Sequence, residues 1–141
     1  MTSIEFTVPG LPIAQPRQRH RIIGKFVQNY TPTKSPVNVF KSAVQLCAAE
    51  QMSGALMEGP LHLEVQMYFP RPKSKQWKKR PMPRECHTGK PDLDNVLKSL
   101  KDALKNVVWH DDAQVFHVDA SKYVCDGTES PRTVVRIFAA V

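Results

Sequence analysis

The sequence predicts an α+β fold, a two-layer sandwich in which two helices pack on one face of a mixed β-sheet. Three observations predict it. Two stretches repeat apolar residues at helical spacing, other stretches have the pattern of strands, and the two kinds of segment are interleaved along the chain. A chain of 141 residues is long enough for a substantial core, so we expect residues 1–141 to form a single domain.

The chain is expected to begin with a strand, a loop and a hairpin. Residues 3–8 read as a strand, which Pro9 and Gly10 end. Residues 11–20 carry two prolines and a basic run, so we expect a loop there. Residues 21–30 then predict a hairpin that turns at Gly24-Lys25.

A helix and a second strand follow. Ser35 suits the N-cap position and Pro36 the first helical position, so we expect a helix that runs to about Gln51. Residues 61–69 alternate strictly, which predicts a strand half-buried against a helix. The apolar residues that set the two periods are Val37, Phe40, Val44, Cys47 and Ala48 in the helix, and Leu61, Leu63, Val65, Met67 and Phe69 in the strand.

The second half begins with a long loop. Residues 70–91 contain five prolines and no periodicity, and a loop of that length in a compact domain is usually functional or disordered. A second helix is expected from near Asp92, and residues 114–124 and 132–138 predict a closing hairpin. The apolar stripe of the second helix consists of Leu93, Val96, Leu97, Leu100 and Leu104.

Positive charge is concentrated in two parts of the chain. The net charge of +7 comes from 20 basic and 13 acidic residues. No acidic residue lies between Glu5 and Glu50, and the segment from Arg71 to Lys90 has eight basic residues and one acidic residue. Segregated basic charge favours a nucleic-acid-binding surface. The alternative is solvated charge that keeps the protein soluble.

Other features of the sequence indicate in which cellular compartment the protein is expected. No apolar run approaches the roughly 20 residues that cross a bilayer, and the N-terminus lacks the pattern of a secretory signal. The three cysteines, Cys47, Cys86 and Cys125, are widely spaced without a CxxC motif, which is typical of reduced thiols. We therefore expect a cytoplasmic protein with no membrane partner.

Six of the thirteen acidic residues gather in one part of this basic chain. Asp92 and Asp94 lie at the start of the second helix, and Asp111 and Asp112 follow its end. A helix of about 12 residues is about 18 Å long, so it separates the two pairs. The seven residues that begin at Asn106 span about 23 Å when extended, and asparagine tolerates the left-handed conformation that reverses a helix end. The pairs meet if this segment folds back, and otherwise only across a dimer interface.

Carboxylates in a basic protein fit metal-dependent cleavage of a phosphodiester. Mg²⁺ is usually held by one or two carboxylates together with phosphate oxygens and water. Asp92, Asp94 and Asp112 are therefore candidate catalytic residues and metal ligands, and Asp111 is a further candidate ligand. Lys98 lies one turn after Asp94, where it could orient a carboxylate or place positive charge at the scissile phosphate.

Each of these residues also has a structural explanation. Aspartates in the first turn of a helix cap free N–H groups and favour the helix dipole. Asp111 and Asp112 could form a turn before a strand, and Asp94, Lys98 and Asp102 could form i,i+4 pairs worth about 0.2–0.5 kcal/mol each. The pattern supplies more acidic residues than one cap needs, so the catalytic interpretation stays open beside the structural one.

Several motifs occur here in one order and at defined spacing. They are Lys90-Pro91-Asp92-x-Asp94-Asn95, Lys98, Asp102-Ala103-Leu104 and Trp109-x-Asp111-Asp112-Ala113-Gln114, preceded by Phe69-Pro70-Arg71-Pro72-Lys73-Ser74 and His87-Thr88. This combination resembles the RusA family of Holliday junction resolvases. The resemblance is strongest over residues 60–124 and looser at the termini.

The resemblance implies a RusA-like fold and a homodimeric endodeoxyribonuclease that depends on Mg²⁺, with Mn²⁺ as a possible substitute. Such an enzyme makes paired symmetric nicks in four-way DNA junctions during recombination and repair, and is often encoded by prophages and phages. Asp92, Asp94 and Asp112 match the catalytic aspartates of the family, and Lys98 matches its essential lysine. The family often has a small-residue turn such as Asn-Gly after the helix, where this chain has Asn106-Val107.

The basic segments supply the candidate DNA contacts. Within them, Trp77 could stack on an unpaired base or anchor the loop on the protein. Two other functions stay open: a nuclease with a broader preference for branched or flapped DNA, and a non-catalytic nucleic-acid-binding protein. The candidate DNA-binding residues are Arg17, Arg19, Arg71, Lys73, Lys75, Trp77, Lys78, Lys79 and Arg80.

Overall fold

The computed structural model describes residues 2–16, 19–23, 26–30, 35–77 and 80–140. Its strands form a mixed five-stranded sheet in the order β1-β7-β4-β6-β5 and a separate two-stranded sheet of β2 and β3. The strands are β1 (Ser3–Pro9), β2 (Arg19–Ile23), β3 (Phe26–Tyr30), β4 (Leu61–Phe69), β5 (Glu85–Cys86), β6 (Val115–Val124) and β7 (Arg132–Ala139). The helices are α1 (Pro36–Ala49) and α2 (Leu93–Leu104), with short 3-10 turns η1 (Lys73–Lys75) and η2 (Asp112–Gln114).

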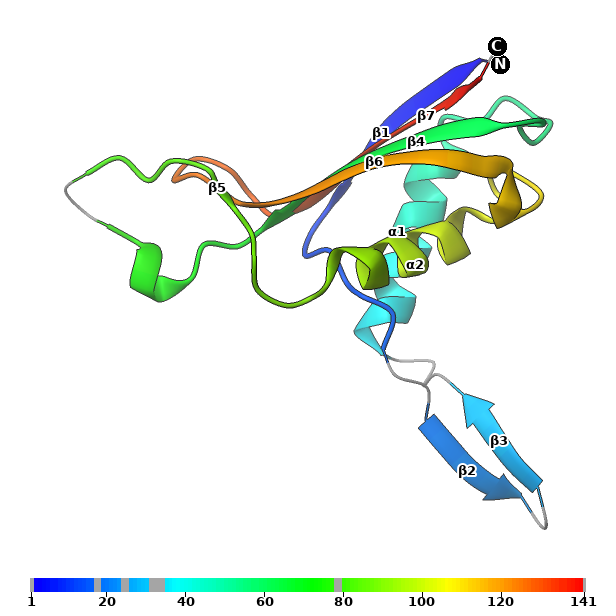
Figure 1. The fold of residues 1–141 in the computed structure, drawn as a ribbon, viewed down its shortest axis with the longest axis horizontal. Coiled ribbons are helices and arrows are strands. Elements are labelled where there is room, and N and C mark those ends of the chain that lie inside the picture. Colours follow the sequence, from blue (N-terminus) through cyan, green and yellow to red (C-terminus); the bar gives the residue numbers. More distant parts are fainter. Residues whose placement is uncertain (1, 17–18, 24–25, 31–34, 78–79, 141) are drawn as a thin grey trace.

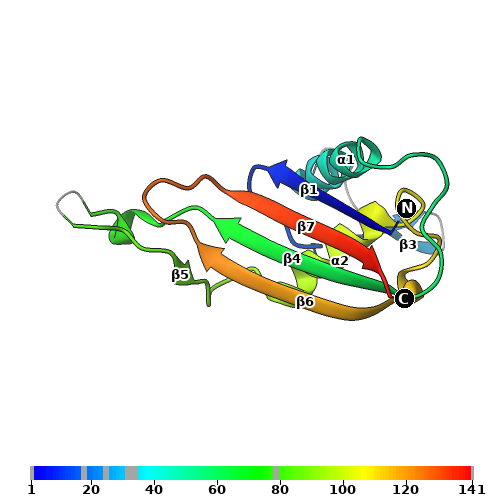
Figure 2. The ribbon, with the colours of Figure 1, turned by 90° about the horizontal axis from the view of Figure 1, so that it is seen from above.

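Both helices lie on one face of the five-stranded sheet (Figure 1), and the opposite face is seen from above in Figure 2. The core forms between these layers. The alternating residues of β4 point into it, with Leu61, Leu63 and Met67 fully buried. The predicted stripe of α2 meets them, since Val96 and Leu100 are also fully buried. The α+β prediction with two helices on one face is confirmed.

The predicted closing hairpin is wrong, because β6 and β7 do not pair with each other. The strand β4 lies between them, parallel to β6 and antiparallel to β7. Parallel strands need a long crossover connection, which α2 and the segments around it supply between β4 and β6. Each of the two C-terminal strands therefore covers one edge of β4. Local turn signals between β6 and β7 could not show which strand separates them.

The segment 70–91, which was predicted to be a loop, includes two short regular elements among its described residues. It contains η1 and the strand β5, which pairs antiparallel with the end of β6. Arg71 organises the segment from inside: its guanidinium donates to the backbone oxygens of Lys75 (2.5 Å), Pro83 (2.8 Å) and Cys125 (3.3 Å). One buried arginine therefore joins both halves of this segment to the loop after β6.

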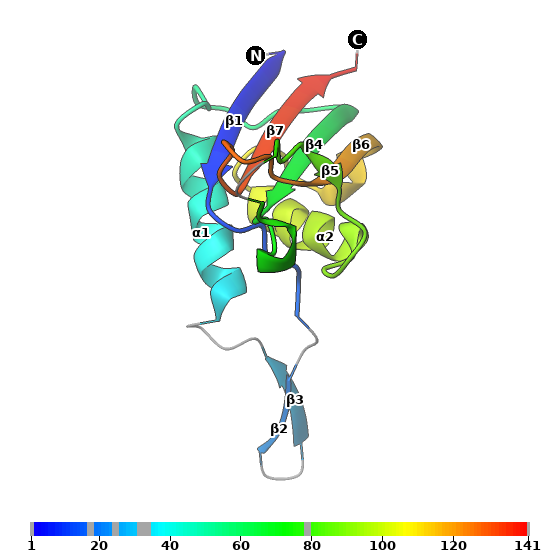
Figure 3. The same ribbon diagram turned by 90° about the vertical axis from the view of Figure 1, so that its left-hand side faces the viewer.

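Smaller differences concern the ends of elements. The first helix ends at Ala49 rather than near Gln51, and Ser35 is its N-cap without a side-chain capping bond. The predicted hairpin is present as β2 and β3, shown as a separate pair of strands in Figure 3, although its turn at residues 24–25 lies outside the described residues. No helix in the described part of the chain is long and apolar enough to span a membrane.

Candidate active site

The turn after α2 determines where the second acidic pair lies. Asn106 adopts the left-handed conformation, with φ of 65°, and its N–H donates to the carbonyl oxygen of Trp109 (2.7 Å). Val108 and Trp109 follow with fully buried side chains. The chain therefore reverses direction at Asn106, which is one of the two possibilities that the length of the segment left open.

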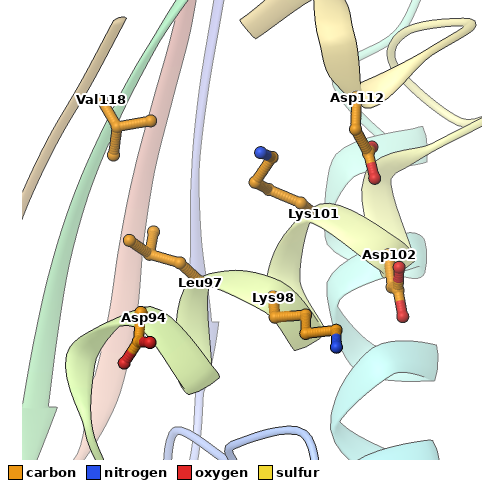
Figure 4. A pocket seen from close by; sticks show the side chains of 7 residues that line it. All are labelled: Asp94, Leu97, Lys98, Lys101, Asp102, Asp112 and Val118. Atoms are coloured by element: carbon orange, nitrogen blue, oxygen red, sulfur yellow. The ribbon is translucent and has the colours of Figure 1, made fainter.

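The reversal brings parts of both acidic pairs to one cavity of about 350 Å³. Asp94 comes from the first turn of α2 and Asp112 from η2, and Lys98 also lines the cavity. In Figure 4 the two aspartates lie at opposite ends of the view, with the side chain of Lys98 between them. The remaining lining residues are Leu97, Lys101, Asp102 and Val118.

The charged groups on α2 do not form the i,i+4 pairs that offered a structural explanation. Asp102 pairs instead with Lys41 of α1, at 3.4 Å between Nζ and Oδ2. Asp94 and Lys98 are exposed and have no ion pair within 4 Å among the residues that the structure describes. Both groups are thus available to a ligand in the cavity.

Asp92 is the N-cap residue of α2, but its carboxylate makes no capping hydrogen bond. It is exposed and is not among the residues that line the cavity. The structural explanation of Asp92 as a side-chain cap is therefore not realised. Its position two residues before Asp94 places it at the entrance of the same helix.

Asp111 and Asp112 have different roles in the turn before β6. The side chain of Asp111 accepts from the N–H of Ala113 (2.9 Å), and Gln114 Oε1 accepts from the N–H of Asp111 (3.0 Å), which completes a capping box. Asp112 Oδ1 instead accepts from the indole N–H of the buried Trp109 (2.8 Å). The turn-forming explanation therefore applies to Asp111, whereas Asp112 is oriented toward the cavity by a rigid donor.

Sequence reasoning missed the functions of Gln114 and Trp109. The amide of Gln114 also donates to the carbonyl oxygens of Met57 (3.0 Å) and Gly59 (3.1 Å), which ties the turn to the segment before β4. The spacing Asp111-x-x-Gln114 is that of a capping box, a signal that could have identified Asp111 as structural. No comparable sequence signal pairs Trp109 with Asp112.

The predicted metal ligands do not form a compact cluster. Among the described residues, no group of three or more His, Cys, Asp or Glu side chains could hold a metal ion. Asp94 and Asp112 are nevertheless the type of ligand that Mg²⁺ prefers, and Mg²⁺ often uses only one or two carboxylates and keeps several waters. The donor set therefore fits a hydrated divalent ion better than an ion enclosed by four aspartates.

The candidate DNA-binding residues fall into three groups. Arg17, Lys78 and Lys79 lie outside the described residues, and Arg19 is placed only by its backbone, in β2. Arg71 is buried at 8% exposure and its guanidinium bonds to backbone carbonyls. These internal bonds indicate a structural role for Arg71, and its contact with DNA stays a prediction.

The other basic residues of the loop are exposed. Lys73 and Lys75 lie on η1, and Lys75 pairs with Glu85 at 3.5 Å. The guanidinium of Arg80 lies 3.7 Å from the ring centroid of Trp77, which is half-buried. This contact favours the interpretation that Trp77 anchors the loop, because its ring already has a cationic partner.

Comparison with known families places the chain among the endodeoxyribonucleases. The family described as endodeoxyribonuclease RusA matches residues 9–138. The chain is also 37% identical over 142 residues to a protein of Bacillus subtilis (strain 168) described as "Uncharacterized protein YqaN", a match that covers 97% of this chain and 96% of that protein. The protein therefore belongs to the RusA endodeoxyribonuclease family.

Proposed function

We propose that this protein is a Holliday junction resolvase, which makes paired symmetric nicks in four-way DNA junctions during recombination and repair. Membership of the RusA family supports cleavage of DNA. The observation that carries the proposal is the cavity at α2, which Asp94, Lys98 and Asp112 all line without forming ion pairs with one another. Unpaired charges of both signs around one cavity suit a phosphodiester and a cation better than they suit folding.

Within this proposal, Asp94 and Asp112 would hold a divalent metal, Mg²⁺ or as a substitute Mn²⁺, and Asp92 would be a third ligand. When bound, the metal stabilises negative charge on the phosphate and lowers the pKa of water. Trp109 holds Asp112 through its indole N–H, so the carboxylate keeps its orientation. Lys98 places a positive charge beside the phosphate, where negative charge develops as the bond to the leaving oxygen breaks.

The basic loop supplies contacts to the DNA backbone in the same proposal. Lys73, Lys75 and Arg80 are exposed there, and phosphate contacts of this kind position DNA without reading its sequence. A four-way junction has two-fold symmetry, so we propose a homodimer with two equivalent sites. We place its action in the cytoplasm of a bacterial or phage-infected cell.

An Mg²⁺-dependent cleavage assay on a mobile four-way junction tests this function, with a flap and a linear duplex of matched sequence as controls. We expect nicking of two strands of like polarity in the junction and little cleavage of either control. Equal rates on flap or duplex would replace the proposal with a broader branched-DNA nuclease. Tight junction binding without cleavage in Mg²⁺ or Mn²⁺ would leave a non-catalytic nucleic-acid-binding protein.

A further inference from the structure

The segment that leads into α2 is attached to β6 by one lysine. Lys122 Nζ donates to the carbonyl oxygens of Gly89 (2.8 Å) and Pro91 (2.6 Å). The backbone of the same residue contributes a third contact, because its carbonyl oxygen accepts from the N–H of His87 (3.0 Å). Residues 87–91 are therefore held against the sheet at both ends of the segment.

The charge of Lys122 serves this attachment. No carboxylate lies within 4 Å of its ammonium group in the described ranges, although the side chain is only half-exposed. An ammonium group has three donors and no acceptor, and two of these donors are used by the carbonyls. Hydrogen bonds from a charged donor are stronger than neutral ones, so Lys122 is suited to fix these two peptide groups.

The position of Pro91 connects Lys122 to the acidic residues. The carbonyl of Pro91 belongs to the planar peptide group that enters Asp92, so its orientation determines the direction in which α2 begins. The carboxylate of Asp92 is not held by a capping bond, and Asp94 lies in the first helical turn with its side chain at the cavity. The backbone before the helix is therefore the structure that can orient both carboxylates.

We propose that Lys122 is a positioning residue, which holds residues 89–91 so that Asp92 and Asp94 present their carboxylates to the metal and the scissile phosphate. The inference rests on the proposed function for its catalytic meaning. It adds a charged residue of β6 to a site whose other charged residues come from the start of α2, α2 itself and η2. Lys122 does not touch the reacting atoms, and its effect reaches them through the backbone.

Three variants test the proposal: Lys122→Met, Lys122→Arg and the control Lys105→Met, which removes an exposed lysine beyond the end of α2. The measurement is the Mg²⁺ concentration at half-maximal junction cleavage in single turnover. Loss of an outer residue that orients a metal ligand typically costs about 10–100-fold in metal affinity or activity. We expect an increase of about tenfold or more for Lys122→Met, substantial rescue by Lys122→Arg, and no change for Lys105→Met. Junction affinity without metal should stay at the wild-type value.

Two readouts do not depend on cleavage. Amide hydrogen exchange of residues 89–95 should accelerate in Lys122→Met while the midpoint of thermal unfolding stays close to wild type, and a titration with Mg²⁺ alone should show weakened binding. If the wild type fails to nick junctions, the proposed function fails, while exchange and titration still decide the role of Lys122. Wild-type Mg²⁺ dependence in Lys122→Met would overturn the inference. A loss that Lys122→Arg does not rescue, accompanied by a lower unfolding midpoint, would also overturn it.

Discussion

Single residues around the cavity differ in what their charges contact. The carboxylate of Asp111 accepts a hydrogen bond from the backbone of its own turn, and the carboxylate of Asp102 forms an ion pair with Lys41. Asp94 and Lys98 have no ion pair in the part of the chain that the structure describes, and Asp112 is held by a neutral indole donor. The second set is the one whose charges no other charged side chain neutralises, so these charges stay available to a ligand in the cavity.

Replacing one carboxylate of this second set by an amide separates catalysis from binding. We expect that Asp94→Asn or Asp112→Asn abolishes junction nicking in Mg²⁺, and that Asp92→Asn does so as well, since each change removes a proposed metal ligand. Junction affinity, measured by gel shift without metal, should persist because the basic surface is unchanged. Asp119→Asn, which alters an exposed acid outside the cavity, is the matched control. Full nicking by any of the three variants would exclude that residue as a ligand.

The indole of Trp109 offers a test of orientation at constant charge. Trp109→Phe keeps an aromatic ring in the core but removes the N–H that Asp112 accepts. We expect nicking to fall by about 10–100-fold, as for other residues that orient metal ligands. We also expect Trp109→Phe to weaken Mg²⁺ binding less in the Asp112→Asn background than in the wild type. A double-mutant cycle on Mg²⁺ affinity measures this coupling, because Asp112→Asn leaves no nicking rate to compare. Additive losses would show that the indole does not act through Asp112.

At the scale of elements, the loop 70–91 is held by ionic contacts as well as by Arg71. Glu129, in the loop after β6, accepts from Arg84 (Nη2 to Oε2, 2.5 Å) and from Arg132 (3.1 Å). The hydrogen bond with Arg84 is the main cause that lowers the pKa of Glu129 from 4.5 to about 2. Arg84 lies within the loop 70–91, so this contact joins two segments that are far apart in the sequence.

The lowered pKa of Glu129 predicts how this contact responds to acid. The unfolded chain binds a proton on Glu129 at a higher pH than the folded chain does, so stability rises with pH in that range. The contribution is present above the unfolded value of 4.5 and is lost as the pH falls to about 2. We expect the unfolding midpoint of Glu129→Gln to depend less on pH over this interval than that of the wild type. Identical slopes in thermal melts would contradict the assignment.

Three consecutive basic residues of the same loop are expected to contribute electrostatic affinity for DNA. Replacing Lys78, Lys79 and Arg80 with alanine should reduce the slope of log affinity against log salt by about 0.9 for each lost phosphate contact. The Arg71→Lys variant is a useful comparison, because Arg71 is buried and should change the stability of the loop rather than the salt slope. An unchanged slope in the triple variant would show that these three residues do not contact phosphates.

At the scale of the whole molecule, sequence periodicity predicted where the helices and strands are better than local turn signals predicted which strands pair in the sheet. The stripe of α2 and the alternation of β4 led directly to the core, since both patterns record burial. The placement of β4 between β6 and β7 depends on pairing between strands that are far apart in the sequence. Local turn signals do not encode such pairing. The reversal at Asn106 followed from length and from the tolerance of asparagine for positive φ. The internal bonds of Arg71 and the indole bond of Trp109 depend on tertiary contacts that no spacing rule describes.

A homodimer is the last requirement of the proposed function, because paired nicks need two sites that act on one junction. We expect sedimentation equilibrium to give twice the mass of one chain. Purified heterodimers that carry Asp94→Asn in one subunit should nick one strand of a junction, whereas wild-type dimers nick both within one binding event. On a supercoiled plasmid with an extruded cruciform, the wild type then yields linear product and the heterodimer yields nicked circles. Linear product from the heterodimer at the wild-type rate would show that one subunit makes both cuts, and the two-site proposal would then fail.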